Sequence, residues 1–185
     1  FIGDLAYQPI ISIVLPTFNS NLNFLTQAIE SVQGQSYPNW QLCIADDAST
    51  DKMVTNYLRE LENNEKISII YRNTNGHISA ATNSALDLAN GEFVTFLDHD
   101  DKLHPHALAA VVSQLNEDQG LDILYSDEDK IDEHGNRSEP FFKPGWSPDL
   151  LLSQNYTCHL SVYRKTLIDK LNGVRAGTEG AQDYD

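Results

Sequence analysis

The stretch from Gly91 to Asp101, GEFVTFLDHDD, decides how this chain folds. Its apolar run, residues 93–97, is too short for a globular helix and rich in residues that favour β-structure, which predicts a buried strand. Acidic residues follow this predicted strand directly. Asp98 and Asp100 lie two residues apart where the chain is expected to be extended, so their carboxylates can point the same way. Two carboxylates at such a short distance repel each other, and a cation between them removes the repulsion.

This acidic corner has two interpretations. Paired aspartates at the carboxyl end of a buried strand suit a hard cation such as Mg²⁺ or Mn²⁺, whose remaining positions water and phosphate oxygens can fill. Alternatively, the corner is a solvated loop in which Asp101 helps to cap the following helix. The chain around the stretch favours the cation, because other predicted strands also end in polar residues.

Strands alternate with amphipathic helices on both sides of this stretch. The predicted strands before it comprise residues 10–15, 40–45 and 67–71. Helices with an apolar face are predicted at residues 22–32, 54–61, 79–89 and 108–115. Pro16 is expected to stop the first strand, Gly34 to close the first helix, and Pro105 to occupy the first position of the last helix.

This alternation predicts an α/β fold with a mostly parallel, Rossmann-like central sheet flanked by helices. Right-handed crossovers in such a fold bring the carboxyl ends of the strands to one edge, where ligands bind. Three predicted strand ends are polar: residues 17–19, Asp46 with Asp47, and residues 98–101. We therefore expect these residues to converge on one site.

The chain is less regular after Asp118. A short strand at residues 122–126, an acidic corner at 127–130, a turn at 133–136 and an alternating strand at 157–163 are predicted. Between them, residues 141–148 predict an ordered aromatic loop, in which core packing of Phe141, Phe142 and Trp146 is favoured over stacking on a sugar ring. The chain ends at Asp185 directly after a glycine-rich loop, which indicates a domain truncated at its C-terminus.

The composition fits one acidic, globular domain. The chain has 185 residues, of which 41% are hydrophobic, enough to bury a core. Its 27 acidic and 12 basic residues give a net charge of −15, which disfavours binding to nucleic acid or anionic lipid. Cys43 and Cys158 lack metal-ligand spacing and lie in apolar, strand-like surroundings, so we expect buried free thiols in a reducing compartment. Neither a transmembrane segment nor a signal peptide is predicted.

Four segments match, in order, the motifs of one enzyme family: Pro16-Thr17-Phe18-Asn19, residues 44–51, residues 91–101 and Gln182-Asp183-Tyr184-Asp185. With these segments the chain resembles the family 2 glycosyltransferases of the GT-A fold, inverting enzymes that use nucleotide-diphosphate sugars. Residues 125–130, 142–144 and 159–161 resemble the bacterial branch that builds rhamnose-containing and other cell-surface polysaccharides. The resemblance implies a single GT-A domain, with a nucleotide-sugar-binding half at residues 1–118 and an acceptor-side half at residues 119–185.

The resemblance also implies a donor site. In this family the loop that corresponds to Pro16, Thr17 and Asn19 holds the nucleotide, and the aspartate that corresponds to Asp47 accepts a hydrogen bond from the base. The implied donor is a UDP- or dTDP-sugar. Family members often carry an arginine at the position of Thr82, so a cationic contact to the donor is expected to be missing here.

Asp98-His99-Asp100 stands where the family has its DxD motif. By the resemblance, Asp98 contacts the ribose or a metal-bound water, and Asp100 ligates the Mn²⁺ or Mg²⁺ that bridges the diphosphate. Asp183 matches the general base that takes the proton of the acceptor hydroxyl, with Gln182 in place of the usual glutamate. Such a base typically contributes a factor of about 10²–10⁴ to the rate. The alternative for Asp183 is a tail residue without a role.

Three further features have open roles. His77 and His159 are both candidates for the site. His159 is either a metal or substrate contact or, more commonly for a lone histidine, a hydrogen-bonded structural residue. The cluster Asp127-Glu128-Asp129 either shapes the acceptor pocket or forms a solvated turn.

The predicted function is metal-dependent, inverting sugar transfer to a hydroxyl of a growing cell-surface polysaccharide or a lipid-linked glycan. The expected location is the cytoplasm or, through other parts of the protein, the inner face of the cell membrane. A noncatalytic nucleotide-sugar or glycan-binding module would keep the donor residues but need no base. A sugar-nucleotide pyrophosphorylase has a related architecture, but it normally shows a glycine-rich, basic loop in place of Pro16-Thr17-Phe18-Asn19.

Overall fold

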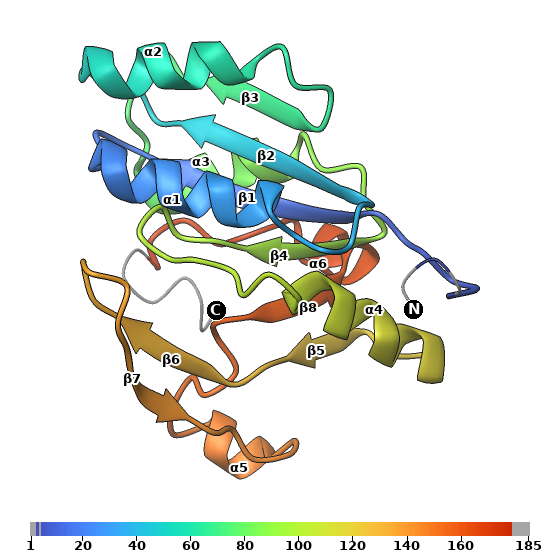
Figure 1. The fold of residues 1–185 in the computed structure, drawn as a ribbon. Helices are drawn as coiled ribbons and strands as arrows, with labels where there is room; N and C mark the ends of the chain where they lie inside the picture. The colour runs from blue at the N-terminus through green and yellow to red at the C-terminus, as the bar shows by residue number, and fades with distance from the viewer. Residues whose placement is uncertain (1–2, 4, 179–185) are drawn as a thin grey trace.

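The computed structural model describes residue 3 and residues 5–178. Its main element is a six-stranded sheet with the strand order β3-β2-β1-β4-β8-β5 (Figure 1). The strands are β1 (Ile11–Thr17), β2 (Trp40–Asp46), β3 (Ile67–Tyr71), β4 (Phe93–Phe96), β5 (Ile123–Tyr125) and β8 (Ser161–Arg164), with β6 (Glu128–Ile131) and β7 (Arg137–Phe141) in a separate hairpin. The helices are α1 (Leu22–Gln33), α2 (Lys52–Leu61), α3 (His77–Leu86), α4 (Ala107–Glu117), α5 (Pro148–Leu151) and α6 (Lys165–Leu171). None of these helices is long and apolar enough to cross a membrane.

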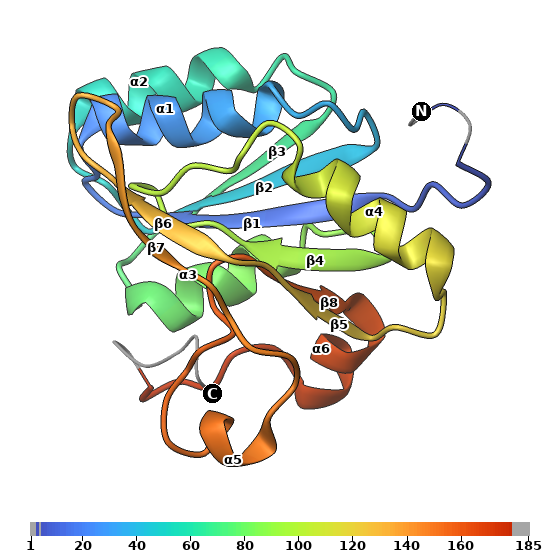
Figure 2. The ribbon, with the colours of Figure 1, turned by 60° about the horizontal axis from the view of Figure 1, so that its bottom comes forward.

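The sheet is mostly parallel, which confirms the predicted α/β fold. β1 pairs in parallel with β2 and β4, and β2 pairs in parallel with β3, whereas β8 runs antiparallel to both β4 and β5. Helices α1, α2 and α4 cover one face, and α3 and α6 cover the other (Figure 2). The strand order reverses between β1 and β4, and in doubly wound sheets the ligand crevice lies beyond the carboxyl ends at that point.

Hydrophobic layers on both faces hold the helices on the sheet. Ile13 and Leu15 of β1 pack in one layer with Ile29 of α1 and Leu108 of α4. Val14, which points the other way, packs in a second layer with Ala81 and other residues of α3. Because both faces are covered, every residue of β1 and β2 is buried, as is usual for a parallel sheet.

β1 continues through Pro16, so the prediction that Pro16 ends this strand is wrong. The backbone oxygen of Val14 accepts from Leu97 N, directly after β4, and that of Thr17 accepts from Asp47 N. Alternate residues therefore face the two neighbours, and Pro16 faces the β4 side, where pairing has already ended at Val14. Proline lacks an N–H group, which costs nothing on an unpaired side.

The bounds of α3 and α4 also differ from prediction. α3 starts and ends earlier than residues 79–89, and α4 begins at Ala107 rather than at Pro105. Gln35 explains the start of α4, because its Nε2 donates to the His104 carbonyl and its Oε1 accepts from Leu108 N. A glutamine from the end of α1 thus satisfies a backbone N–H that the helix cannot satisfy itself.

The second half departs most from prediction. The strand predicted at residues 157–163 is reduced to β8, and residues 157–160 are irregular. There, the Lys143 ammonium rather than a neighbouring strand binds the carbonyls of Thr157 and His159. The predicted acidic corner at 127–130 lies largely in β6, whereas the turn at 133–136 is confirmed as the loop between β6 and β7. Neither α5 nor α6 was predicted.

The aromatic loop between β7 and α5 is exposed. The Phe142 side chain is 76% exposed and that of Trp146 is 61% exposed. Phe141, at the end of β7, is 39% exposed. The prediction that these three side chains pack in the core is therefore wrong.

Gly91 allows a close approach of two backbones. A Cβ at this position would lie 2.6 Å from the Ile10 carbonyl oxygen and 2.8 Å from Ser12 N. We expect Gly91→Ala to lower the free energy of unfolding by about 1–3 kcal/mol, because the chain entering β4 would have to move away from β1. Urea denaturation measures the change. Gly145→Ala is the control, since nothing lies within 4 Å of its Cβ position. Equal losses in the two variants would contradict the packing explanation.

Candidate functional site

The predicted strand ends meet at one edge of the sheet. Thr17 and Asp46 are paired across β1 and β2, and the chain leaves the neighbouring strand β4 toward Asp98 at the same edge. A cavity of about 730 Å³ lies beside Pro16 and Asp98, within the size range of about 300–1,000 Å³ that is usual for small-ligand pockets. The predicted convergence of β1 and β4 on one site is therefore present in the fold.

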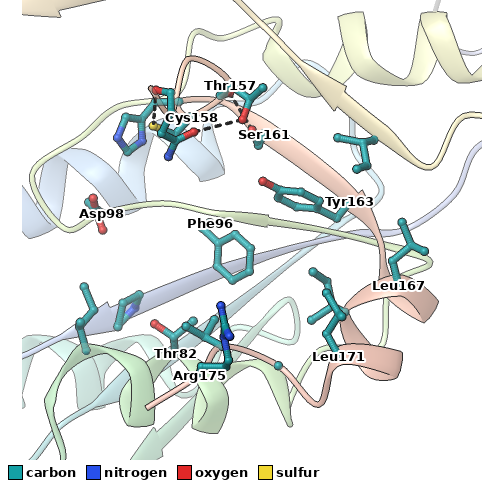
Figure 3. A pocket seen from close by; sticks show the side chains of 18 of the residues that line it. Thr82, Phe96, Asp98, Thr157, Cys158, Ser161, Tyr163, Leu167, Leu171 and Arg175 are labelled. Atoms are coloured by element: carbon teal, nitrogen blue, oxygen red, sulfur yellow. Dashed lines mark hydrogen bonds between the residues drawn. The ribbon is translucent and has the colours of Figure 1, made fainter. Parts of the chain in front are cut away.

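The cavity has a polar and an apolar end. Asp98 lies at one end, Leu167 and Leu171 of α6 lie at the other, and the rings of Phe96 and Tyr163 lie between them (Figure 3). These two rings are in edge contact, with centroids 6.0 Å apart. A ligand that fills the cavity would thus have one charged or polar part and one less polar part.

Asn19 fastens the loop after β1 to the loop after β2. Its Oδ1 accepts from Thr50 N at 2.8 Å and from Asp51 N at 3.0 Å, and its backbone N–H donates to Ser49 Oγ at 2.8 Å. Its φ of +45° is in the left-handed region, which asparagine tolerates better than most residues. Nearby, Thr17 Oγ1 and Ser20 Oγ form a buried hydrogen bond of 2.7 Å. In this structure Asn19 and Thr17 shape the loop.

Asp47 is buried and paired with a cation from the next strand end. Arg72 Nε donates to Asp47 Oδ1 at 2.6 Å, and Gly76 N lies 3.0 Å from both carboxylate oxygens. The Arg72 Nη1 donates to the Ala80 carbonyl at 2.9 Å and to Ser84 Oγ, and thereby reaches α3. The Asp47 side chain is 3% exposed, so this buried ion pair links the ends of β2 and β3 to α3 within the protein interior.

A turn brings Asp98 and Asp101 together. Asp101 N donates to the Asp98 carbonyl at 3.2 Å, and His99 and Asp100 form the tip of the turn. The chain is therefore not extended here, contrary to the prediction that placed the carboxylates of Asp98 and Asp100 side by side. The Asp100 side chain is 58% exposed and lies 4.0 Å from His99 Nδ1.

His159 completes this corner from the second half of the chain. Its Nδ1 lies 3.6 Å from Asp101 Oδ2, and one ligand atom each from Asp98, Asp101 and His159 lie within 4.8 Å of one another. Burial raises the pKa of the Asp101 carboxyl, while the charge of His159 opposes that increase. Two carboxylates and one imidazole form a donor set that suits Mn²⁺ and can also accept Mg²⁺. The side chains present here thus fit a divalent cation.

Two of these residues were missed by sequence reasoning about the site. Arg72 directly follows β3, so extending the search for polar strand ends to a basic residue would have found it. Asp101 was assigned only to capping, because a spacing of two residues was taken to align carboxylates. The role of His77 stays open: it is the exposed first residue of α3, with φ +65°. Asp127 is exposed, and Asp183 lies outside the described residues.

Arg175 is a basic residue in the wall of the cavity. It lines the same cavity as Thr82 of α3, the position at which a cationic contact was expected to be missing (Figure 3). Lys170 of α6 also lines the cavity. Cationic side chains from a different element are thus present on this wall.

Comparison with known proteins gives one family and one fold. The family model described as glycosyl transferase family 2 matches residues 12–171. The O-antigen biosynthesis protein RfbC of Myxococcus xanthus is 40% identical over 185 residues, which cover 100% of this chain and 14% of RfbC. The chain therefore spans a small part of the length of this relative.

Two solved structures share the fold. TarS of S. aureus in complex with UDP has a TM-score of 0.75 at 23% identity, over 94% of this chain and 52% of that chain. The mannosyltransferase PcManGT from Pyrobaculum calidifontis, in complex with GDP-Man and Mn²⁺, has a TM-score of 0.73 at 20% identity, over 98% of this chain and 51% of that chain. The chain spans about half of each, and at these identities the likeness shows the fold.

The two cysteines are expected to differ in reactivity. Neither forms a disulfide, and Cys43 is buried as predicted, but Cys158 is only partly buried and lines the cavity. Burial raises the pKa of the Cys43 thiol to about 12, so this residue has almost no thiolate at neutral pH. We expect one thiol per chain to react promptly with the thiol reagent DTNB at pH 8, and the second only in urea. Cys158→Ala removes the prompt reaction; two prompt thiols would contradict the burial of Cys43.

Proposed function

Because the chain belongs to glycosyl transferase family 2, we propose that it binds a nucleotide-diphosphate sugar at the carboxyl edge of the sheet and transfers the sugar with inversion. The proposed acceptor is a hydroxyl of a growing cell-surface polysaccharide or of a lipid-linked glycan. One observation carries the proposal: Asp98, Asp101 and His159 converge at the polar end of a cavity of sufficient size.

A divalent cation is part of the proposal for an electrostatic reason. The chain has a net charge of −15, and a diphosphate beside Asp98 and Asp101 would face carboxylates at close range. We propose that Asp98, Asp101 and His159 hold Mn²⁺ or Mg²⁺, and the DxD assignment of Asp98 with Asp100 is the alternative. The bound cation would supply Lewis-acid stabilisation of the charge that develops on the departing diphosphate.

The base of the nucleotide is proposed to lie next to Asp47. Uracil and thymine both present a ring N–H group, from which a carboxylate oxygen can accept a hydrogen bond. Among the described residues, Asp47 Oδ2 accepts only from Gly76 N, whereas Oδ1 accepts from Gly76 N and Arg72. Oδ2 therefore keeps acceptor capacity, and Arg72 holds the carboxylate in its orientation. This arrangement supports a UDP- or dTDP-sugar as the donor.

The transfer step needs a base for the acceptor hydroxyl, and we propose Asp183. Its carboxylate would take the hydroxyl proton as the hydroxyl oxygen attacks the anomeric carbon from the side opposite the diphosphate. The new C–O bond forms as the bond to the diphosphate breaks, and the diphosphate leaves with the electron pair. Attack from the opposite side inverts the anomeric configuration.

UDP binding is expected to depend on the cation. Isothermal calorimetry of the chain with UDP in Mn²⁺ should give binding that is lost in excess EDTA, because the diphosphate would then face Asp98 unshielded. Mg²⁺ should restore it. Equal affinity in Mn²⁺ and in EDTA would exclude a cation from the donor site.

Three single variants separate the two proposed ligand sets. Asp98→Asn and Asp101→Asn are each expected to weaken Mn²⁺-dependent UDP binding at least about tenfold, because each removes a ligand charge. Asp100→Asn should leave it nearly unchanged, since this side chain is 58% exposed at the tip of the turn. A large loss in Asp100→Asn with none in Asp101→Asn would restore the DxD assignment.

Asp183→Asn is expected to separate binding from transfer. The variant should bind the donor like the wild type and transfer the sugar about 10²–10⁴-fold more slowly, because an amide cannot take the proton. Single-turnover assays of the whole protein with a saturating donor measure the step. Asp87→Asn, an exposed position that follows α3, is the control. Normal turnover of Asp183→Asn would remove Asp183 from the mechanism.

A further inference from the structure

The ammonium group of Lys143 is buried and binds the segment that carries His159. The Lys143 side chain is 1% exposed, and its Nζ lies 3.0 Å from Glu128 Oε2. The same Nζ donates to the carbonyl oxygens of Thr157 at 3.4 Å, of His159 at 3.0 Å, and of Cys158 between them. A charged ammonium is costly to bury unless oxygen atoms replace its water; here the three carbonyl oxygens accept its hydrogen bonds and the Glu128 carboxylate balances its charge.

The three carbonyl groups lie in an irregular segment and bind this ammonium instead of a neighbouring strand. Residues 157–159 belong to no strand, so no strand ladder binds their backbone oxygens, whereas the Leu160 carbonyl accepts from Ser126 N. Ser161 Oγ donates to the Thr157 carbonyl at 2.7 Å. The Cys158 and His159 carbonyls both accept from Lys143 Nζ. We call Lys143 with these three carbonyls the Lys143 clamp.

Lys143 is itself held in place by the residues around it. Its backbone N–H donates to Asp127 Oδ1 at 2.7 Å, and the hydroxyl of Tyr125 donates to the carbonyl of the next residue, Pro144, at 2.8 Å. One end of the Lys143 side chain is thus fixed to the β5–β6 region, and the other end fixes the segment that leads into β8.

The clamp ends at the residue that reaches the acidic corner. His159 contributes its carbonyl to Lys143 and its imidazole to the cluster with Asp98 and Asp101. The imidazole is 45% exposed, so packing around the ring holds it only in part. Its direction is therefore set largely by the backbone of residue 159, which the clamp fixes.

We propose that Lys143 is a positioning residue: its buried ammonium fixes the backbone of residues 157–159 and so holds the His159 imidazole against Asp98 and Asp101. For the cation, this inference rests on the proposed function. The order that Lys143 imposes on residues 157–159 can be tested without any cation.

The first test is Lys143→Met, which keeps the apolar stem and removes the ammonium. The Kd of Mn²⁺ in the presence of UDP, measured from the electron paramagnetic resonance signal of free Mn²⁺, is expected to rise about tenfold, as is typical when a residue that orients a ligand is lost. In the metal-free protein, DTNB should react faster with Cys158, because the Cys158 carbonyl is no longer held.

Lys130→Met is the matched control. Lys130 also pairs with a glutamate of the hairpin, Glu139, but its side chain is 74% exposed and the described contacts include no bond to residues 157–159. The same change of charge is thus made without breaking the clamp. Both the Mn²⁺ affinity and the rate of the Cys158 reaction should stay at the wild-type values.

A double variant separates positioning from stability. Lys143→Met also leaves the Glu128 carboxylate without its cation, which by itself destabilises the fold. In Lys143→Met with Glu128→Gln that charge is gone, so the thermal midpoint should recover in part while the Mn²⁺ affinity and the Cys158 rate stay altered. If the affinity recovers together with the midpoint, Lys143 has only a structural role and the inference is overturned.

The remaining outcomes are also decisive. Unchanged Mn²⁺ affinity in Lys143→Met, with a wild type that binds Mn²⁺, overturns the inference and leaves the proposed function standing. A wild type that binds neither Mn²⁺ nor UDP overturns the proposed function. The clamp is then judged by Cys158 alone: faster reaction in Lys143→Met than in Lys130→Met supports it, and equal rates refute it.

Discussion

Negative charge gathered at one edge of a sheet is the constraint on which this structure depends. Parallel strands bring Asp47 and Asp98 to the same edge, and a turn adds Asp101. Asp47 is balanced inside the protein, by Arg72 at 2.6 Å. Beside Asp101 the described side chains place a histidine at 3.6 Å, and this corner opens on a cavity. Asp47 therefore ties the fold together and keeps one oxygen for the proposed contact to the base, whereas the corner at Asp98 and Asp101 is left for a cation.

The regular half of the fold could be predicted because its signals are local. The alternation of short apolar runs with amphipathic helices defined β1 to β4 and α1 to α4, and the closing Gly34 is confirmed. Two of the errors share a cause, which is a side chain that acts from far along the chain. Gln35 binds the backbone at the start of α4, and Lys143 binds the carbonyls of residues 157–159, where a strand was predicted. No local pattern contains such contacts.

The sequence placed Pro16 and Asp98 at the sheet edge where the cavity lies, but it did not group Asp98 with Asp101 and His159. Pro16 and Asp98 line the cavity, as expected for residues that follow parallel strands. The expectation of an extended backbone from Asp98 to Asp100 is wrong, because a turn at this point brings residues three apart together. His159 could be considered from sequence, but its approach to Asp101 depends on the path of the irregular segment before β8.

The same charges explain why a bound metal cation suits the proposed chemistry better than the buried Arg72 side chain does. At physiological ionic strength, charges more than about 8 Å apart are largely screened, so most of the net charge of −15 has little influence on a bound diphosphate. The carboxylates at the corner are too close to be screened. Arg72 cannot offset them, because its guanidinium is engaged with Asp47, Ala80 and Ser84 on the inner side. A small ion between the carboxylates would meet both needs at once, since it removes their repulsion and gives the diphosphate a positive partner at contact distance.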